Sequence, residues 1–139
     1  MKKMMTILVS CLALCMSLAQ SIARAEPEST PATARREVTA DTLLQRQSTS
    51  AKLLIIDART PAEFAQGHVP GAINLPHDTI SGREPVLAGW TNETVVLYCQ
   101  SGRRASLAAA VLERQGFMKL EHLQGDMPGW EKSGKPVEK

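Results

Sequence analysis

The chain has 139 residues, of which 43% are hydrophobic and 22% are charged, a size and composition that suit one folded domain. Its 16 basic and 14 acidic residues leave a net charge of +2. This near balance lacks the dense basic face that nucleic-acid binding needs, so we expect no nucleic-acid partner.

Residues 1–25 have the three parts of a secretory signal peptide. Lys2 and Lys3 give a positive start, residues 7–18 form an apolar run, and an Ala-Arg-Ala cleavage site ends the segment. The apolar run is too short to cross a bilayer easily, so a membrane anchor is the weaker alternative and we expect no stable membrane insertion after cleavage. We therefore predict export to the periplasm.

Cleavage after residue 25 would change both the charge and the thiol content of the chain. It removes three of the 16 basic residues and none of the 14 acidic ones, so the remainder has a net charge of −1. It also removes Cys11 and Cys15. Cys11 ends a Leu-Val-Ser-Cys lipobox, which makes lipoprotein anchoring an alternative, although the apolar run before it is short. Cys99 would then be the only thiol, and a lone cysteine is structural, intermolecular or reactive.

The rest of the chain alternates apolar runs with helical patterns. Residues 26–37, rich in Pro, Ser, Thr and Ala, predict a flexible linker, and residues 38–139 predict a single domain without internal repeats. In chain order we expect a strand opening at Val38, a helix over 40–47, a strand over 53–56, a short helix from 61 that stops at Gly67, a strand over 72–75, a strand over 94–98, a helix over 105–115, a strand over 120–123 and, over 125–130, a turn that can include one helical turn. This alternation predicts an α/β three-layer sandwich with a mainly parallel central sheet flanked by helices.

The inward faces of two segments can also be predicted. Helical spacing predicts an apolar stripe along residues 105–115, and the less regular segment over 77–92 predicts one or two short helices. The side chains expected to face the core are Leu107, Val111 and Leu112 in the first segment and Val86, Leu87 and Trp90 in the second.

Cys99 stands at the end of a buried strand, just before a helix. Ligands of open α/β sheets bind beyond the carboxyl ends of the strands, and a helix N-terminus attracts anions. Gly102 lets the intervening loop curl so that its N–H groups point at one place, and Arg103 and Arg104 add two permanent charges. Because helix N-termini and cations favour a thiolate, the order predicts a reactive thiol facing a bound anion. The alternative is a buried cysteine beside two solvated arginines.

Three stretches together resemble rhodanese domains. IIDARTPAEFAQGHVPGAINLP (residues 55–76) is similar to the opening signature of the family, CQSGRRA (residues 99–105) to its active-site loop, and GDMPGW (residues 125–130) to its closing motif. With its predicted signal peptide, the chain most resembles the small single-domain periplasmic rhodaneses of bacteria, including the phage-shock type. The resemblance implies a rhodanese-like fold.

The resemblance also implies a thiosulfate sulfurtransferase. Cys99 would attack the outer sulfur of thiosulfate and carry it, as a transient persulfide and with no other cofactor, to cyanide or a thiol acceptor. The implied substrate-binding residues are Gln100, Ser101, Gly102, Arg103 and Arg104. The cationic loop favours thiosulfate over 3-mercaptopyruvate as donor, and we expect the chain to work as a monomer.

Asp57 and Arg59 follow the first core strand and so lie near the same sheet edge. By resemblance they support the loop, through an ion pair with one of its arginines, whereas acid–base catalysis by Asp57 is the alternative. Glu63 can complete a helix capping box, which is a sufficient role without a pairing to Arg59. The three histidines lack metal-ligand spacing, so we expect no metal site.

Other functions stay open from the sequence alone. The main alternative is a non-catalytic or partner-dependent persulfide carrier or binding module. A phosphatase or arsenate reductase is disfavoured, because Cys99 and Arg104 make a C-x4-R loop, one residue shorter than the C-x5-R loop of related phosphatases. A structural domain with an incidental thiol is disfavoured by Gly102 and the two arginines.

Overall fold

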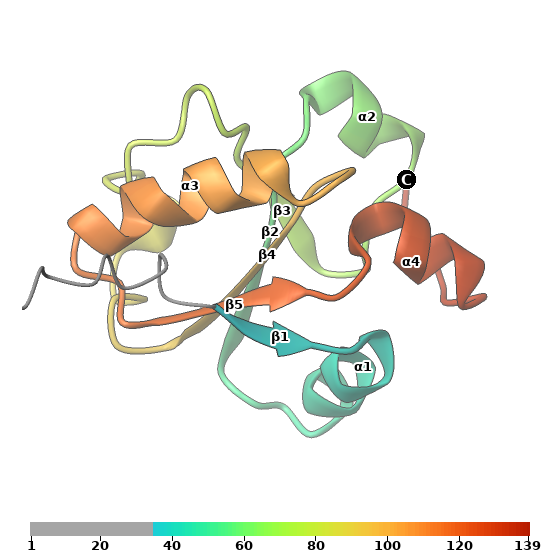
Figure 1. Cartoon of the computed structure of the whole chain (residues 1–139). Coiled ribbons are helices and arrows are strands. Elements are labelled where there is room, and N and C mark those ends of the chain that lie inside the picture. Colours follow the sequence, from blue (N-terminus) through green and yellow to red (C-terminus); the bar gives the residue numbers. More distant parts are fainter. Residues whose placement is uncertain (1–34) are drawn as a thin grey trace, which may run out of the picture. The chain divides into compact units, whose positions relative to one another are not determined.

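The computed structural model describes residues 35–139, whose strands form one parallel sheet (Figure 1). The strands lie in the order β1-β5-β4-β2-β3, and each neighbouring pair is parallel. The elements are β1 (Arg36–Val38), α1 (Ala40–Ser48), β2 (Leu53–Asp57), α2 (Pro61–Gln66), β3 (Ala72–Asn74), the 3-10 helix η1 (Pro85–Leu87), β4 (Thr94–Tyr98), α3 (Arg103–Arg114), β5 (Lys119–Leu123) and α4 (Asp126–Lys132). Helices cover both faces, as the predicted three-layer sandwich requires.

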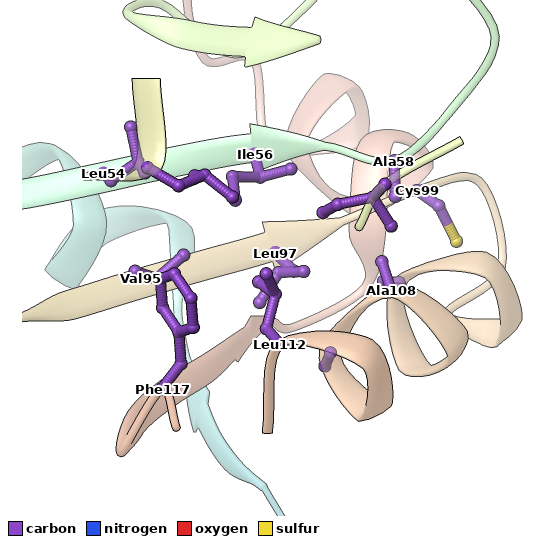
Figure 2. Packing of buried hydrophobic residues seen from close by; sticks show 13 residues of the cluster. Leu54, Ile56, Ala58, Val95, Leu97, Cys99, Ala108, Leu112 and Phe117 are labelled. Atoms are coloured by element: carbon purple, nitrogen blue, oxygen red, sulfur yellow. The ribbon is translucent and has the colours of Figure 1, made fainter. Parts of the chain in front are cut away.

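Side-chain alternation along β2 and β4 divides the interior into two cores, one on each face of the sheet. One core, drawn in Figure 2, packs against α3 and includes Leu54, Ile56, Ala58, Val95, Leu97 and Cys99, with Ala105, Ala108, Ala109 and Leu112 from the helix. The other packs against α1 and α4 and includes Val38, Leu43, Ile55, Val96, Tyr98, Leu123, Met127 and Trp130. Cys99 and Tyr98, adjacent in the chain, therefore face opposite sides of the sheet.

The N-terminal boundary of the domain differs from the sequence prediction. The linker expected over 26–37 ends too late, because Arg36 and Glu37 already belong to β1 and are in register with Glu121 and His122 of β5. Pairing with β5 extends the strand into a segment whose composition suggests a linker. Residues 1–34, with the predicted signal peptide, the lipobox and the rest of the linker, lie outside the described residues. No helix in the described residues is long and apolar enough to cross a bilayer.

The inward faces of the two segments are only partly as expected. Leu112 and Leu87 are buried, but Leu107 is 49% exposed and Val86 is 47% exposed. The α3 helix begins at Arg103 and turns its alanines inward, which leaves Leu107 on the outer side. In a 3-10 helix adjacent residues point about 120° apart, so Val86 and Leu87 cannot both face the core.

Leu112→Ala and Leu107→Ala form a matched pair on α3. Leu112 has no exposed surface, so its truncation leaves a cavity and should lower the free energy of unfolding by about 2–5 kcal/mol. The same change at the exposed Leu107 should alter it by less than about 0.5 kcal/mol. Urea unfolding followed by circular dichroism measures both values, and equal losses would contradict this assignment of the helix faces.

Candidate active site

The thiol of Cys99 lies at the sheet edge where β4 ends and α3 begins. Cys99 directly follows β4, belongs to the core on the α3 side and has no exposed surface. Its sulfur projects beyond that core toward the loop that leads into α3 (Figure 2). The N–H of Gly102 donates to the sulfur at 3.1 Å. The atom that carries the negative charge of a thiolate is thus contacted directly by a loop amide.

The loop between Cys99 and α3 has the backbone of an anion cradle. Gly102 has a φ of +82° in the left-handed region, and a Cβ at this position would lie 3.3 Å from Asp126 Oδ2, so conformation and space both favour glycine. Within the described residues, the loop amides without a protein acceptor are those of Gln100, Ser101, Arg103 and Arg104. Free N–H groups at a helix N-terminus bind anions.

Arg104 is held over the loop by Glu63 of α2. Two parallel hydrogen bonds join them, from Nη1 to Oε2 at 2.7 Å and from Nη2 to Oε1 at 2.8 Å. The same carboxylate caps α2 with the side chain and the N–H of Thr60. The hydrogen bonds with Glu63 raise the pKa of Arg104, and the nearby Cys99 adds to this effect. Glu63 thus completes the predicted capping box and also fixes Arg104. Within residues 35–139 it forms no ion pair with Arg59.

Arg103 differs from Arg104 in its surroundings. Its side chain is exposed, and within residues 35–139 it forms no ion pair. Arg104 is half-buried and tied to a carboxylate. Arg103 is therefore the loop cation that is free to meet an approaching anion in solution.

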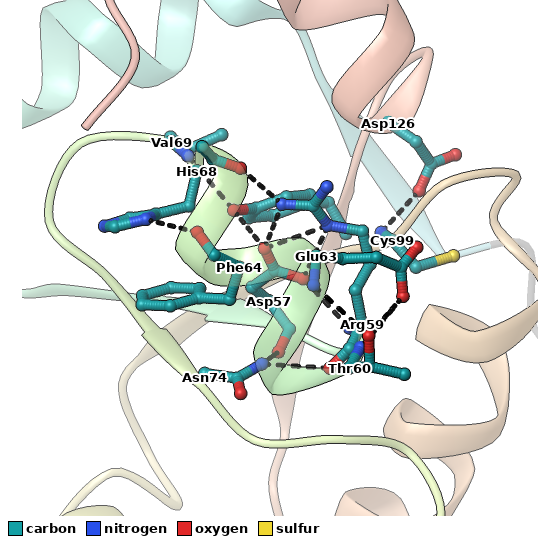
Figure 3. Close-up of polar contacts among 12 residues, drawn as sticks. Asp57, Arg59, Thr60, Glu63, Phe64, His68, Val69, Asn74, Cys99 and Asp126 are labelled. Carbon is teal, nitrogen blue, oxygen red and sulfur yellow. Dashed lines mark hydrogen bonds and ion pairs between the residues drawn. The ribbon is translucent and has the colours of Figure 1, made fainter. Parts of the chain in front are cut away.

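Asp57 and Arg59 form a buried ion pair with each other, not with the loop arginines (Figure 3). Arg59 donates from Nη2 to Asp57 Oδ2 at 2.7 Å and from Nε to Oδ1 at 3.0 Å, and Nη2 also donates to Gly67 O at 2.7 Å. The Tyr98 hydroxyl donates to Asp57 Oδ2 at 2.7 Å and accepts the N–H of Val69. Burial, with the Asp57 charge, raises the pKa of Tyr98, so the phenol keeps its proton as a donor.

This arrangement corrects the predicted ion pair to the loop. Alternation along the strands turns Asp57 and Tyr98 toward the α1 and α4 side of the sheet, whereas Cys99 faces the α3 side. Figure 3 shows the Cys99 sulfur pointing away from the Asp57–Arg59 pair. Asp57 therefore supports the ends of the strands from the opposite face and does not contact Arg103 or Arg104.

Asp126 is a site residue that sequence reasoning missed. Its Oδ1 accepts the Cys99 N–H at 2.8 Å and lies 3.0 Å from His122 Nε2. The next residue, Met127, donates its N–H to the Cys99 carbonyl at 3.0 Å. The only sequence signal was an acidic residue beside a glycine in the closing motif, which says nothing of a contact to a residue 27 positions earlier.

A polar groove of about 350 Å³ opens beside the loop, between α2 and α4. It is lined by Arg59, Glu63, Gln66, Gly67, Gln100, Met127 and Glu131. Because Gln100 directly follows Cys99, a molecule in this groove would lie next to the reactive loop. Residues 35–139 contain no group of three or more His, Cys, Asp or Glu side chains that could hold a metal ion.

The comparisons with known proteins agree with this geometry. The family model of the Rhodanese-like domain matches residues 39–133. The chain is 37% identical over 101 residues to a sulfurtransferase of Allochromatium vinosum, an alignment that covers 73% of this chain and 92% of that protein. It is 36% identical over 70 residues to the thiosulfate sulfurtransferase PspE of Escherichia coli, with coverage of 50% and 67%.

Other matches extend the range of relatives. The putative sulfur carrier protein YrkF of Bacillus subtilis is 29% identical over 105 residues, which cover 76% of this chain and 56% of YrkF. The chain spans only 22% of the length of a probable adenylyltransferase/sulfurtransferase of Mycobacterium tuberculosis. The solution structure of the Rhodanese-like domain of the Anabaena Alr3790 protein has a TM-score of 0.66 at 23% identity, covering 75% of this chain and 79% of that one, and confirms the fold class.

Glu63→Gln tests the Glu63–Arg104 clamp, because glutamine keeps the capping geometry but loses the charge. Hydrogen bonds from Arg104, helped by those from Thr60, lower the pKa of Glu63 from 4.5 to about 2. A lowered carboxylate pKa contributes stability above pH 4.5 that is lost as the pH falls toward 2. We expect the variant to be less stable at neutral pH by on the order of 1–2 kcal/mol, a value reduced for partial exposure of the pair.

Urea unfolding of both proteins across the acid range measures this difference. It should shrink below pH 4.5 and vanish only below about pH 2, where Glu63 becomes fully protonated in the folded protein. A difference that stays constant through this window would mean that the charge of Glu63 does not stabilise the fold.

Proposed function

Because the chain belongs to the rhodanese-like domain family, we propose that it is a sulfurtransferase that moves the sulfane sulfur of thiosulfate through a persulfide of Cys99 to cyanide or a thiol acceptor. The observation that carries this proposal is the contact between the Cys99 sulfur and the Gly102 N–H, within a loop whose other amides have no acceptor in residues 35–139. The thiosulfate sulfurtransferase named among the relatives supports the choice of donor.

The proposed reaction has two displacement steps. First, the Cys99 thiolate attacks the outer sulfur of thiosulfate, a sulfur–sulfur bond forms to Sγ, and sulfite leaves with the electron pair of the broken bond. Then the acceptor attacks the outer sulfur of the persulfide and Cys99 leaves as a thiolate. With cyanide as acceptor the product is thiocyanate. Neither step needs an added proton, metal or redox cofactor, so the only covalent intermediate proposed is the Cys99 persulfide.

The charges around the loop fit a dianionic donor. A thiolate and thiosulfate together bring three negative charges into one place, and a site must offset their repulsion. The free amides of the loop and the α3 dipole supply fixed partial charges, and the exposed Arg103 supplies a full one. Arg104 is already paired with Glu63, so it shapes the site more than it adds net charge.

A persulfide carrier is the second candidate function. One relative is named a putative sulfur carrier protein, and a polar groove of about 350 Å³ lies beside Gln100, next to the thiol. In this reading Cys99 is loaded by another protein and not by a small molecule. Turnover with small donors and acceptors separates the two candidates.

The setting of the reaction is also a proposal. We propose export to the periplasm from the composition of residues 1–25, with lipoprotein anchoring at Cys11 as the less favoured form. We further propose that the exported domain acts as a monomer, without a nucleic-acid partner. Its proposed partners are therefore a small sulfur donor and a thiol or cyanide acceptor.

Intact mass of the full chain after incubation with thiosulfate tests the proposed function. The chain carries Cys11→Ser and Cys15→Ser so that Cys99 is its only thiol. We expect a gain of one sulfur atom, which cyanide removes as thiocyanate appears. The matched control, with Cys99→Ser added, should gain no sulfur because a hydroxyl cannot form a persulfide.

No added sulfur on reduced, folded protein would overturn thiosulfate as the donor. Loading by a persulfide-bearing protein without turnover of thiosulfate and cyanide would favour the carrier function.

Donor preference can be measured by steady-state rates. Thiosulfate carries two negative charges and 3-mercaptopyruvate one, so the amide cradle and Arg103 should favour thiosulfate. We expect kcat/KM for thiosulfate to exceed that for 3-mercaptopyruvate by on the order of tenfold. Raising the ionic strength should reduce this ratio, because Arg103 is exposed to solvent. A faster reaction with 3-mercaptopyruvate would contradict the preference.

A further inference from the structure

Asp126 occupies a backbone conformation that few side chains adopt. Its φ is +54°, and it begins α4 directly after Gly125, which has a φ of +77°. A glycine would take this conformation without steric cost, whereas Asp and Asn are among the few other residues that tolerate it. A non-glycine residue persists at such a position when the surrounding contacts require its side chain.

The contacts of Asp126 show what its carboxylate holds. Oδ1 accepts the Cys99 N–H at 2.8 Å, drawn in Figure 3, while the Met127 N–H donates to the Cys99 carbonyl at 3.0 Å. The first two residues of α4 thus bind both polar groups of the Cys99 backbone. This fixes the orientation of the residue that bears the thiol and turns its N–H away from the anion cradle.

The same contact places a negative charge beneath a loop built for anions. Asp126 is 5% exposed, and its Oδ2 faces Gly102, where a side-chain Cβ would lie 3.3 Å away. Burial disfavours the charged form of Asp126, but the hydrogen bonds with His122 and the Cys99 N–H outweigh it and lower the pKa. An uncompensated carboxylate here would repel both a thiolate and a dianionic donor.

His122 is the group placed to compensate that charge. Its Nε2 lies 3.0 Å from Asp126 Oδ1, and the hydrogen bond with Asp126 raises the pKa of His122 above 6.5. From the β1 side, Glu37 Oε1 lies 3.9 Å from Nδ1 and Arg35 is also near. The α3 residues around His122, Ala105 and Ser106, carry no charge, and Glu121 lines the same small cavity.

Resting on the proposed function, we propose that Asp126 and His122 are positioning residues for sulfur transfer: Asp126 orients Cys99, and protonated His122 cancels the Asp126 charge so that the loop accepts an anionic sulfur donor. When His122 loses its proton, the pair changes from neutral to a charge of −1 while Asp126 stays ionised. Binding of thiosulfate should then weaken as the pH rises through the His122 titration. In a plot of kcat/KM against pH, the decrease at high pH should therefore come from a rise in KM for thiosulfate.

Three variants in the full chain with Cys11→Ser and Cys15→Ser separate the parts of this proposal. Asp126→Asn keeps an acceptor for the Cys99 N–H and tolerates the positive φ but has no charge. His122 still titrates in this variant, but its pKa is no longer raised by Asp126, so the rise in KM for thiosulfate should begin at a lower pH than in the wild type. His122→Gln can still donate to Asp126 but cannot become charged, so its KM should be raised on the order of tenfold at the lower pH values.

Asp126→Gly suits the backbone but removes the acceptor of the Cys99 N–H. If only the backbone mattered, this variant would load sulfur like the wild type; we expect a kcat lower at every pH because Cys99 loses its orientation. His68→Gln is the matched histidine control, because His68 Nε2 also lies near a carboxylate, 3.7 Å from Glu138, but does not contact the loop. This control should show the same decrease in kcat/KM for thiosulfate at high pH as the wild type.

Two kinetic results would overturn the proposal. A His122→Gln variant that keeps the wild-type decrease in kcat/KM at high pH would assign this decrease to another group, and an Asp126→Gly variant with wild-type kcat would remove the orienting role. If thiosulfate loads no wild-type protein at any pH, the proposed function fails instead, and alkylation of Cys99 by iodoacetamide still tests the pair without a sulfur donor. The rate of alkylation should begin to rise with pH at a lower pH in Asp126→Asn than in the wild type, and at a higher pH in His122→Gln. Coincident pH curves for the three proteins would refute the proposal.

Discussion

The buried ion pair between Asp57 and Arg59 is the interaction on which the geometry of the site depends. Neither side chain exceeds 6% exposure, and such a pair is costly to bury unless its other polar groups are satisfied. Here the carboxylate also accepts from the Tyr98 hydroxyl, and the guanidinium also donates to the Gly67 carbonyl. The pair thereby joins the ends of β2 and β4 to the segment that follows α2. It fixes this sheet edge from the side covered by α1 and α4, whereas the thiol lies on the α3 side.

Charges near the thiol come as compensated pairs. Glu63 holds Arg104, and His122 lies against Asp126, so each side chain that shapes the loop brings a partner of opposite charge. The attraction for an anion is left to groups without a partner in the described residues, which are the loop amides and Arg103. Backbone amides are fixed in direction and need little reorganisation when charge develops, which suits them to this role.

The sequence was sufficient for the order of elements and for the place of the thiol, because both depend on local patterns. Apolar runs, the capping box at Thr60 and the glycine before α3 are short-range signals, and the structure has the elements in the order that they indicate, although β1 begins two residues earlier than expected. The partners of charged residues could not be predicted in the same way. Asp57 was expected to reach the loop, and Asp126 was not considered, because side-chain direction depends on strand register and on contacts between distant segments. The prediction that Leu107 faces the core was wrong for a related reason. Alanines, which are weak sequence signals of burial, form much of the inward face of α3.

The complete burial of Cys99 has a consequence for the size of the molecules that can exchange sulfur with it. An unloaded thiol with no exposed surface is hard for a cysteine on a folded partner to reach without movement of the loop, which disfavours mixed disulfides in the resting domain. A sulfur bonded to Sγ adds about 2 Å to the reach of the side chain. In the proposed cycle the cargo itself therefore extends the reach of the carrier. With thiosulfate as donor, a small molecule loads the buried thiol, and a large acceptor needs to reach only the outer sulfur of the persulfide.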